Sequence, residues 1–145
     1  MDRCKKYIYS LLAVFIFYPT SYVYSAEQII SVEELSENII ITFEAAPKDT
    51  VFNSSIRQLS EKETDIHIEA LVNWSDDAQI EGQLAKGFIP YVNITSEIVN
   101  ENSGQKKVIE LTPHVNLNDG FHYAKNIKLP GLRNDKYKLK FTIKP

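Results

Sequence analysis

The sequence predicts an all-β fold, a sandwich of about seven short antiparallel strands. The clearest strand is 136–143, in which apolar and polar residues alternate, as expected when one face of a strand packs on a core and the other meets water. Elsewhere, short apolar runs end at polar turn residues, and this spacing is typical of a β-sandwich. The 145 residues, 43% of them hydrophobic, suffice for one domain with a core but not for two.

Six of the strands can be placed along the chain, each a run of apolar or alternating residues that stops at a polar turn. Their expected ranges, in order, are 38–44, 64–72, 89–99, 107–111, 122–127 and 136–143. The turns that separate them are rich in Pro, Gly, Asn, Asp and Ser, the residues that favour turn conformations. These turns are 46–49, 75–77, 100–104, 118–120 and 129–131.

Residues 1–26 have the pattern of a secretory signal peptide. Arg3, Lys5 and Lys6 precede an apolar run at 7–18, and small residues follow up to Ala26. The apolar run is short for a membrane span, so we expect removal of this segment and a mature domain at 27–145. A retained N-terminal anchor is the alternative.

Cysteine content and charge narrow the possible functions. The only cysteine, Cys4, lies in the predicted signal peptide, so the mature domain is expected to have no thiol. Cysteine-ligated clusters and thiolate chemistry are thereby excluded, and any metal must be held by nitrogen and oxygen atoms. Without residues 1–26 the chain has 13 basic and 18 acidic residues. An acidic, exported domain is a poor candidate for binding nucleic acid.

The three histidines of the chain, His67, His114 and His122, fall on predicted strands or at their edges. His67 and Glu69 are two residues apart, so a strand projects both from one face. Imidazole and carboxylate together suit copper, zinc, iron or manganese, and the sequence leaves the choice open. The alternative is that these histidines are ordinary strand residues that face solvent.

Five segments of the chain, in the same order, resemble the P19 family of periplasmic proteins, which are Tpd-like proteins associated with bacterial high-affinity iron transport. The segments are 65–70, 87–92, 112–114, 119–131 and 136–139. The resemblance extends over 31–145 and implies an immunoglobulin-like β-sandwich that forms a homodimer. It also implies a copper site near the dimer interface and a role in iron uptake beside an inner-membrane iron permease.

The resemblance also implies a ligand set. His67 matches the first family histidine, Glu69 the carboxylate two positions on, and His122 the histidine of the D-G-x-H-Y block. His114 stands where the family has a methionine, in a segment that here reads Thr112-Pro113-His114. Thioether favours Cu(I), so imidazole at this position should shift the preference toward Cu(II) or zinc.

A further family histidine, expected beyond the last strand, has no counterpart up to Pro145. The ion would then be held by His67, Glu69, His114 and His122, either completely, with an open position for water, or with a contact from a second chain. Loss of metal binding with retention of the fold is the other possibility.

Two functions from different classes remain. The first is a periplasmic metal-binding accessory of iron uptake, which would carry iron or adjust its redox state and is not expected to be an enzyme. The second is a metal-free immunoglobulin-like interaction domain with incidental histidines. A zinc hydrolase is less favoured, because the sequence shows no nucleophile motif and no general base.

Overall fold

The computed structural model describes residues 27–36, 38–47, 58–78, 81–82, 86–116 and 120–145. The predicted signal peptide lies outside these residues, as do parts of the predicted turns at 46–49 and 118–120. Within the described residues, no helix is long and apolar enough to cross a membrane.

Seven strands and one short 3-10 helix, η1 (Glu61–Glu63), make up the described secondary structure. The strands are β1 (Gln28–Ser36), β2 (Ile39–Ala46), β3 (Ile66–Trp74), β4 (Asn93–Asn100), β5 (Lys106–Asn116), β6 (Gly120–Ile127) and β7 (Tyr137–Lys144). The all-β prediction is confirmed, and β2 to β7 correspond to the six strands placed from the sequence, with shifted ends.

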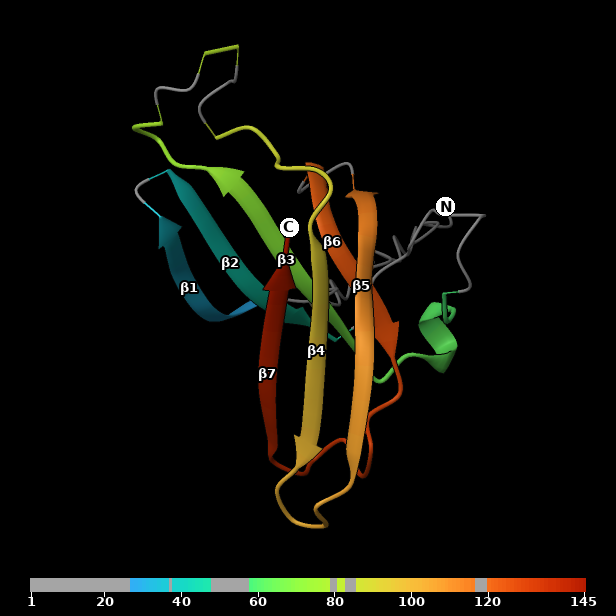
Figure 1. The fold of residues 1–145 in the computed structure, drawn as a ribbon. Helices are drawn as coiled ribbons and strands as arrows, with labels where there is room; N and C mark the ends of the chain where they lie inside the picture. Colours follow the sequence, from blue (N-terminus) through green and yellow to red (C-terminus); the bar gives the residue numbers. More distant parts are fainter. Residues whose placement is uncertain (1–26, 37, 48–57, 79–80, 83–85, 117–119) are drawn as a thin grey trace, which may run out of the picture.

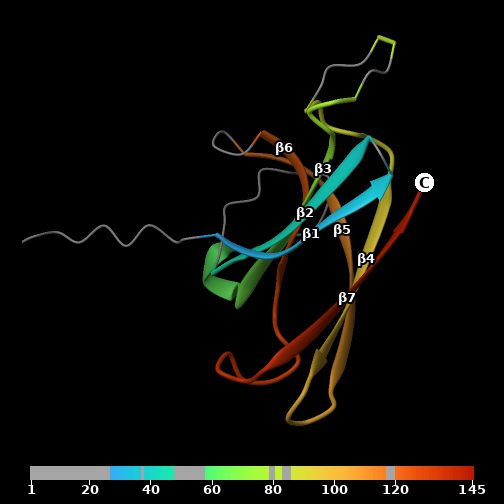
Figure 2. The same cartoon turned by 90° about the vertical axis from the view of Figure 1, so that its left-hand side faces the viewer.

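The seven strands form one antiparallel sheet in the order β1-β2-β3-β6-β5-β4-β7, which curls into a half-barrel (Figures 1 and 2). Strand β5 belongs to both halves of this sheet. Its residues 106–111 pair with β4, and its residues 112–116 pair with β6. The immunoglobulin-like arrangement of two packed sheets stays a prediction.

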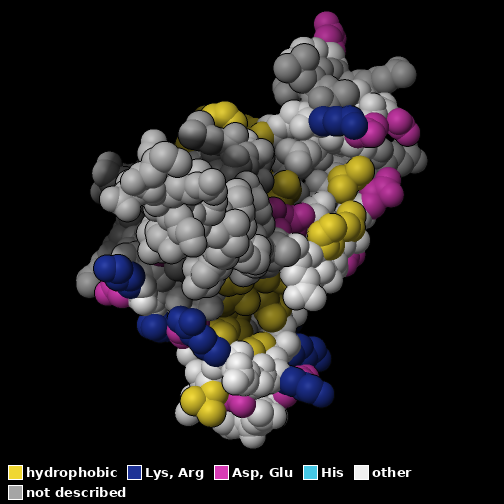
Figure 3. Space-filling model, turned by 180° about the vertical axis from the view of Figure 1, so that it is seen from behind, with side chains coloured by type: hydrophobic (Ala, Val, Ile, Leu, Met, Phe, Trp, Pro, Cys, Tyr) yellow, Lys and Arg dark blue, Asp and Glu magenta, His cyan; other side chains and the backbone are white. Residues whose placement is uncertain are grey.

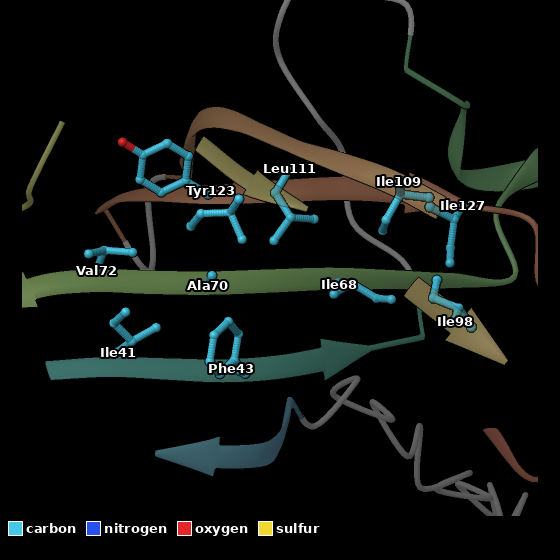
Figure 4. Packing of buried hydrophobic residues seen from close by; sticks show 11 residues of the cluster. Ile41, Phe43, Ile68, Ala70, Val72, Ile98, Ile109, Leu111, Tyr123 and Ile127 are labelled. Atoms are coloured by element: carbon cyan, nitrogen blue, oxygen red, sulfur yellow. The ribbon is translucent and has the colours of Figure 1, made fainter. Parts of the chain in front are cut away.

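The curl brings together strands that are distant in the sheet order. Phe43 of β2 stacks on Phe141 of β7, with ring centroids 3.9 Å apart and planes inclined by 18°. The hydrophobic core fills the inside of the curl with side chains from β2 to β6 (Figure 4). Its members include Ile41, Ile68, Ala70, Val72, Ile98, Leu111, Tyr123 and Ile127.

Strand alternation on β3 decides where the candidate site lies. Ile68, Ala70 and Val72 face the core. Since successive side chains of a strand point to opposite faces, His67 and Glu69 must lie on the outer face of the sheet. The site is therefore built on the back of the core sheet and not inside the hydrophobic core.

Strand β1 was not among the strands placed from the sequence. It lies at an edge of the sheet, and its pairing with β2 has two register shifts, between Ile29 and Ser31 and between Glu34 and Ser36. Such irregularities interrupt the period-two alternation. Its apolar residues Ile29 and Val32 are also 60% and 58% exposed, so core burial imposes no pattern on them.

Candidate metal centre

Three neighbouring strands bring the four predicted ligands to one face of the sheet. His67 pairs with Asn126 of β6, and Glu69 pairs with Ala124. His114 of β5 pairs directly with His122 of β6. Directly opposed residues of an antiparallel pair share a face, and the period of two places His122 on the same face as Ala124. The outer face of β3, β6 and β5 thus carries all four side chains.

All four residues are buried. The exposed fractions are 0% for His67 and His122, 1% for Glu69 and 4% for His114. None of the histidines faces solvent, which contradicts the alternative that they are ordinary exposed strand residues. A buried carboxylate beside buried imidazoles is uncommon, since charged groups are rarely buried without a partner.

Glu69 lies between two histidines. Its Oε1 is 3.0 Å from Nε2 of His67, and its Oε2 is 3.9 Å from Nε2 of His122. Potential ligand atoms of the three residues all lie within 4.8 Å of one another. With metal bonds of about 2 Å, two donors to one ion are at most about 4 Å apart. Both Glu69 contacts meet this limit.

His114 stands beside this cluster and is not one of its three members. Its ring centroid is 4.8 Å from that of His122, with planes at 84°, and 6.1 Å from that of His67. The structure therefore brings the four predicted residues together, with His67, Glu69 and His122 in the tightest arrangement.

The buried polar atoms of the site fit a cation. Within the part of the chain that the structure describes, neither carboxylate oxygen of Glu69 accepts a hydrogen bond, and neither ring nitrogen of His122 makes one. A buried charge without compensating hydrogen bonds costs several kcal/mol. A divalent ion would satisfy the carboxylate and the imidazole lone pairs together, and this nitrogen and oxygen set suits borderline metals.

Two strand neighbours of the site have small side chains, and a third is an acid. Ala124 is opposite Glu69 on one side, and Ala46 of β2 is opposite His67 on the other. Glu44 of β2 is the residue opposite Glu69 on the β2 side. Two carboxylates facing each other across a strand pair repel, and a cation nearby relieves this repulsion.

Asn126 is a site residue that was not singled out from the sequence. Its Oδ1 is 2.6 Å from Nδ1 of His67, and its Nδ2 donates to the carbonyl oxygen of Leu59 at 2.9 Å. Asn126 follows His122 by four residues on one strand, so the period of two places both on the same face. That spacing was a signal available in the sequence.

The start of β3 is fixed by an ionic contact just before His67. Asp65 Oδ1 accepts hydrogen bonds from Nε of Arg133 at 2.8 Å and from Nζ of Lys128 at 3.2 Å, and Oδ2 accepts one from the Leu129 amide at 3.1 Å. Burial alone would raise the pKa of the Asp65 carboxyl, but these hydrogen bonds outweigh it and hold that pKa below its usual value.

Residues 24–145 match the family described as Fe2+ transport protein. The chain belongs to this family. Together with the similar solved structures described next, this match confirms the resemblance to P19 proteins seen in the sequence.

Three solved structures are similar to this chain. FetP of uropathogenic Escherichia coli strain F11 is 26% identical, with a TM-score of 0.67, over 83% of this chain and 76% of that one. A copper-bound FetP variant is 25% identical, with a TM-score of 0.69, over 83% and 77%. Copper-reconstituted P19 of Campylobacter jejuni is 26% identical, with a TM-score of 0.67, over 82% and 76%.

Among curated proteins, a UPF0423 protein of Brucella abortus strain 2308 is 33% identical over 84 residues. This match covers 58% of the chain and 44% of the Brucella protein, so the chain spans less than half the length of that relative.

Proposed function

We propose that this chain binds one divalent copper ion through His67, Glu69, His114 and His122, as an exported, periplasmic accessory of high-affinity iron uptake. The observation that carries the proposal is the buried Glu69 carboxylate set between two buried histidines. Copper-bound forms of two similar proteins, FetP and P19, support the choice of metal.

The donor set favours Cu(II) over Cu(I). All four donors are nitrogen or oxygen, whereas Cu(I) prefers thiolate and thioether. Zinc, iron and manganese accept the same donors, and Cu(II) binds most tightly in the general affinity series. When bound, copper supplies one-electron redox chemistry, and the protein groups hold it away from solvent.

The family and the sequence support the proposed cellular role. Membership of the Fe2+ transport protein family supports a role in iron uptake, and the signal-like pattern at 1–26 supports export. FetP, a similar protein, was expressed recombinantly in the periplasm of E. coli. We expect the chain to work beside an inner-membrane iron permease, as a carrier or redox partner of iron and not as an enzyme.

A homodimer of immunoglobulin-like domains completes the proposal. On the side of the molecule where β1 and β2 lie, hydrophobic side chains gather in a stripe beside acidic ones (Figure 3). In β1, Ile29, Val32 and Leu35 are 60%, 58% and 55% exposed. An exposed apolar edge strand is a common pairing surface, and a second copy of the chain would cover it.

The same stripe favours the second candidate, a metal-free interaction domain. In that case the exposed residues of β1 would bind a partner, and the buried histidines would have only a structural role. The two functions differ in whether the purified protein takes up metal.

A metal titration separates the two functions. Isothermal titration of the metal-free protein with Cu(II) should show about one tight site per chain, and Glu69→Gln should weaken it at least tenfold. Glu97→Gln is the matched control, because Glu97 is an acid of β4 with a 41% exposed side chain. Absence of tight binding in the wild-type protein would favour the interaction domain. Growth of a deletion strain under iron limitation tests the role in uptake.

A further inference from the structure

We propose that Asn126 is a positioning residue that makes Nε2 of His67 the metal-binding atom, by holding the proton of the imidazole on Nδ1. This inference rests on the proposed function, since it assigns the donor atom of one ligand. It also predicts the tautomer of His67 in the metal-free protein, and this tautomer can be measured without any metal.

A hydrogen bond to the backbone of Leu59 determines the orientation of the Asn126 side-chain amide. Its Nδ2 donates to the carbonyl oxygen of Leu59 at 2.9 Å. A carbonyl oxygen only accepts hydrogen bonds, so the nitrogen of the amide must be the atom that faces Leu59. The amide oxygen, Oδ1, is consequently the atom that lies 2.6 Å from His67.

This orientation of the Asn126 amide determines the tautomer of the His67 ring. An amide oxygen only accepts, so Nδ1 of His67 must carry a hydrogen to make a contact at 2.6 Å. Neutral imidazole has one protonated nitrogen, which leaves the lone pair on Nε2. Nε2 is the atom directed at Glu69, at 3.0 Å. The lone pair and the carboxylate thus converge on one place, where a proton or a metal ion can bind.

One more contact holds Asn126, and another holds its partner Gln58. Its backbone amide donates to Oε1 of Gln58 at 3.3 Å, and Nε2 of Gln58 donates to Oγ1 of Thr112 at 3.1 Å. Gln58 and Leu59 precede η1 and lie on the outer face of the sheet beside the site. Through the Asn126 amide, Leu59 therefore contributes to the orientation of the His67 ring.

His122 provides an internal comparison. Among described residues, its two ring nitrogens make no hydrogen bond. Its proton is therefore not assigned to one nitrogen by a neighbouring acceptor. Histidine ligands of metals usually donate their second ring N–H to such an acceptor. His67 has such an acceptor, because Oδ1 of Asn126 accepts the hydrogen bond from its Nδ1.

The first test uses the metal-free wild-type protein. Two-dimensional NMR of 15N-labelled histidine shows which ring nitrogen carries the proton. We expect the neutral His67 ring to carry its proton on Nδ1, next to the Asn126 oxygen. A neutral His67 protonated on Nε2 would overturn the inference without any substitution, and it would leave the metal-binding proposal standing.

The second test uses variants of the full chain. Asn126→Leu removes the acceptor at similar volume and should give mixed His67 tautomers and about 10- to 100-fold weaker Cu(II) binding. Asn126→Asp keeps an acceptor and should restore the Nδ1 tautomer. Asn100→Leu is the control, because Asn100 is equally buried but belongs to a hydrogen-bond network with Asp135. It should lower stability without changing the His67 tautomer.

The results separate failure of the Asn126 role from failure of the proposed copper binding. An Asn126→Leu protein with the wild-type tautomer and affinity would contradict the positioning role. Equal tautomer changes in Asn126→Leu and Asn100→Leu would contradict it too, since they would point to a general loss of stability. Wild-type protein with the Nδ1 tautomer but no Cu(II) binding would support the positioning of His67 and refute the proposed function instead.

Discussion

His114 and His122 face each other directly across the β5–β6 pair, with ring centroids 4.8 Å apart and planes at 84°. They belong to consecutive antiparallel strands, so their separation depends on the local register of one strand pair. His67 reaches the same face from β3, on the other side of β6. The contact between His114 and His122 is therefore local in the sequence. The approach of His67 to His122 requires the pairing of β3 with β6 in the folded sheet.

Replacement of His114 by methionine tests the metal preference. His114→Met introduces the thioether that the P19 resemblance places at this position, and a soft ligand favours Cu(I). We expect the ratio of Cu(I) to Cu(II) affinity to rise at least tenfold, measured by competition with chelators of each oxidation state. His114→Leu is the control for size, and an equal change in that variant would exclude a specific effect of sulfur.

Ala124 should matter for metal binding although it offers no ligand atom. It is fully buried and lies opposite Glu69, between the positions of His122 and Asn126 along β6. Ala124→Val adds two methyl groups at a fully buried position beside the ligands, and overpacking of this kind costs about 1–3 kcal/mol. We expect at least tenfold weaker Cu(II) binding by titration. Unchanged affinity would show that the ion lies elsewhere on the face.

Asp65 should contribute stability that depends on pH. Its side chain is 14% exposed and pairs with Arg133, whose side chain is 61% exposed and therefore partly screened by solvent. We expect Asp65→Asn to lower the free energy of unfolding by about 1 kcal/mol at neutral pH.

The sign of the pH effect follows from the lowered pKa of the Asp65 carboxyl. Such a group stabilises the fold fully above its unfolded pKa, for which 3.8 is the reference value, and this stabilisation is lost as pH falls through the folded value. The difference between wild type and Asp65→Asn in urea denaturation should therefore shrink below about pH 4. A difference that grows in acid would contradict this account.

Ser96 is a buried polar residue with no use in the site. It is 0% exposed on β4, and its hydroxyl makes no hydrogen bond to any described residue. Ser96→Ala should raise the free energy of unfolding by about 1 kcal/mol, because it removes a desolvated hydroxyl. Thr142→Ala on the exposed face of β7 should change it by less than about 0.5 kcal/mol. Destabilisation by Ser96→Ala would mean that its hydroxyl has a partner.

Much of the fold could be predicted because β2 to β7 follow simple patterns. In β7, core-facing Leu139 and Phe141 alternate with exposed Lys138 and Lys140, and this alternation is visible in the sequence. Strand β1 could not be recognised, since its exposed apolar residues and register shifts erase the period of two. The single curled sheet also depends on β5 changing partners between residues 111 and 112, which no local pattern encodes.

The site could be predicted in part for the same reason. The pair His67 and Glu69 is local, because residues two apart on a strand share a face. The placement of His122 beside them was available only from the family resemblance, since it requires β6 to pair with β3 across the order of the chain. The role of Asn126 depends on a side-chain contact with a residue 59 positions away, which the sequence pattern alone does not give.

Copper stoichiometry in two single-histidine variants tests the central claim most directly. After Cu(II) loading and gel filtration, the wild-type protein should retain about one copper per chain, measured by elemental analysis. His67→Ala and His122→Ala should each retain almost none, while circular dichroism shows the wild-type β fold in both. Stoichiometric copper in both folded variants would contradict the assignment of the site.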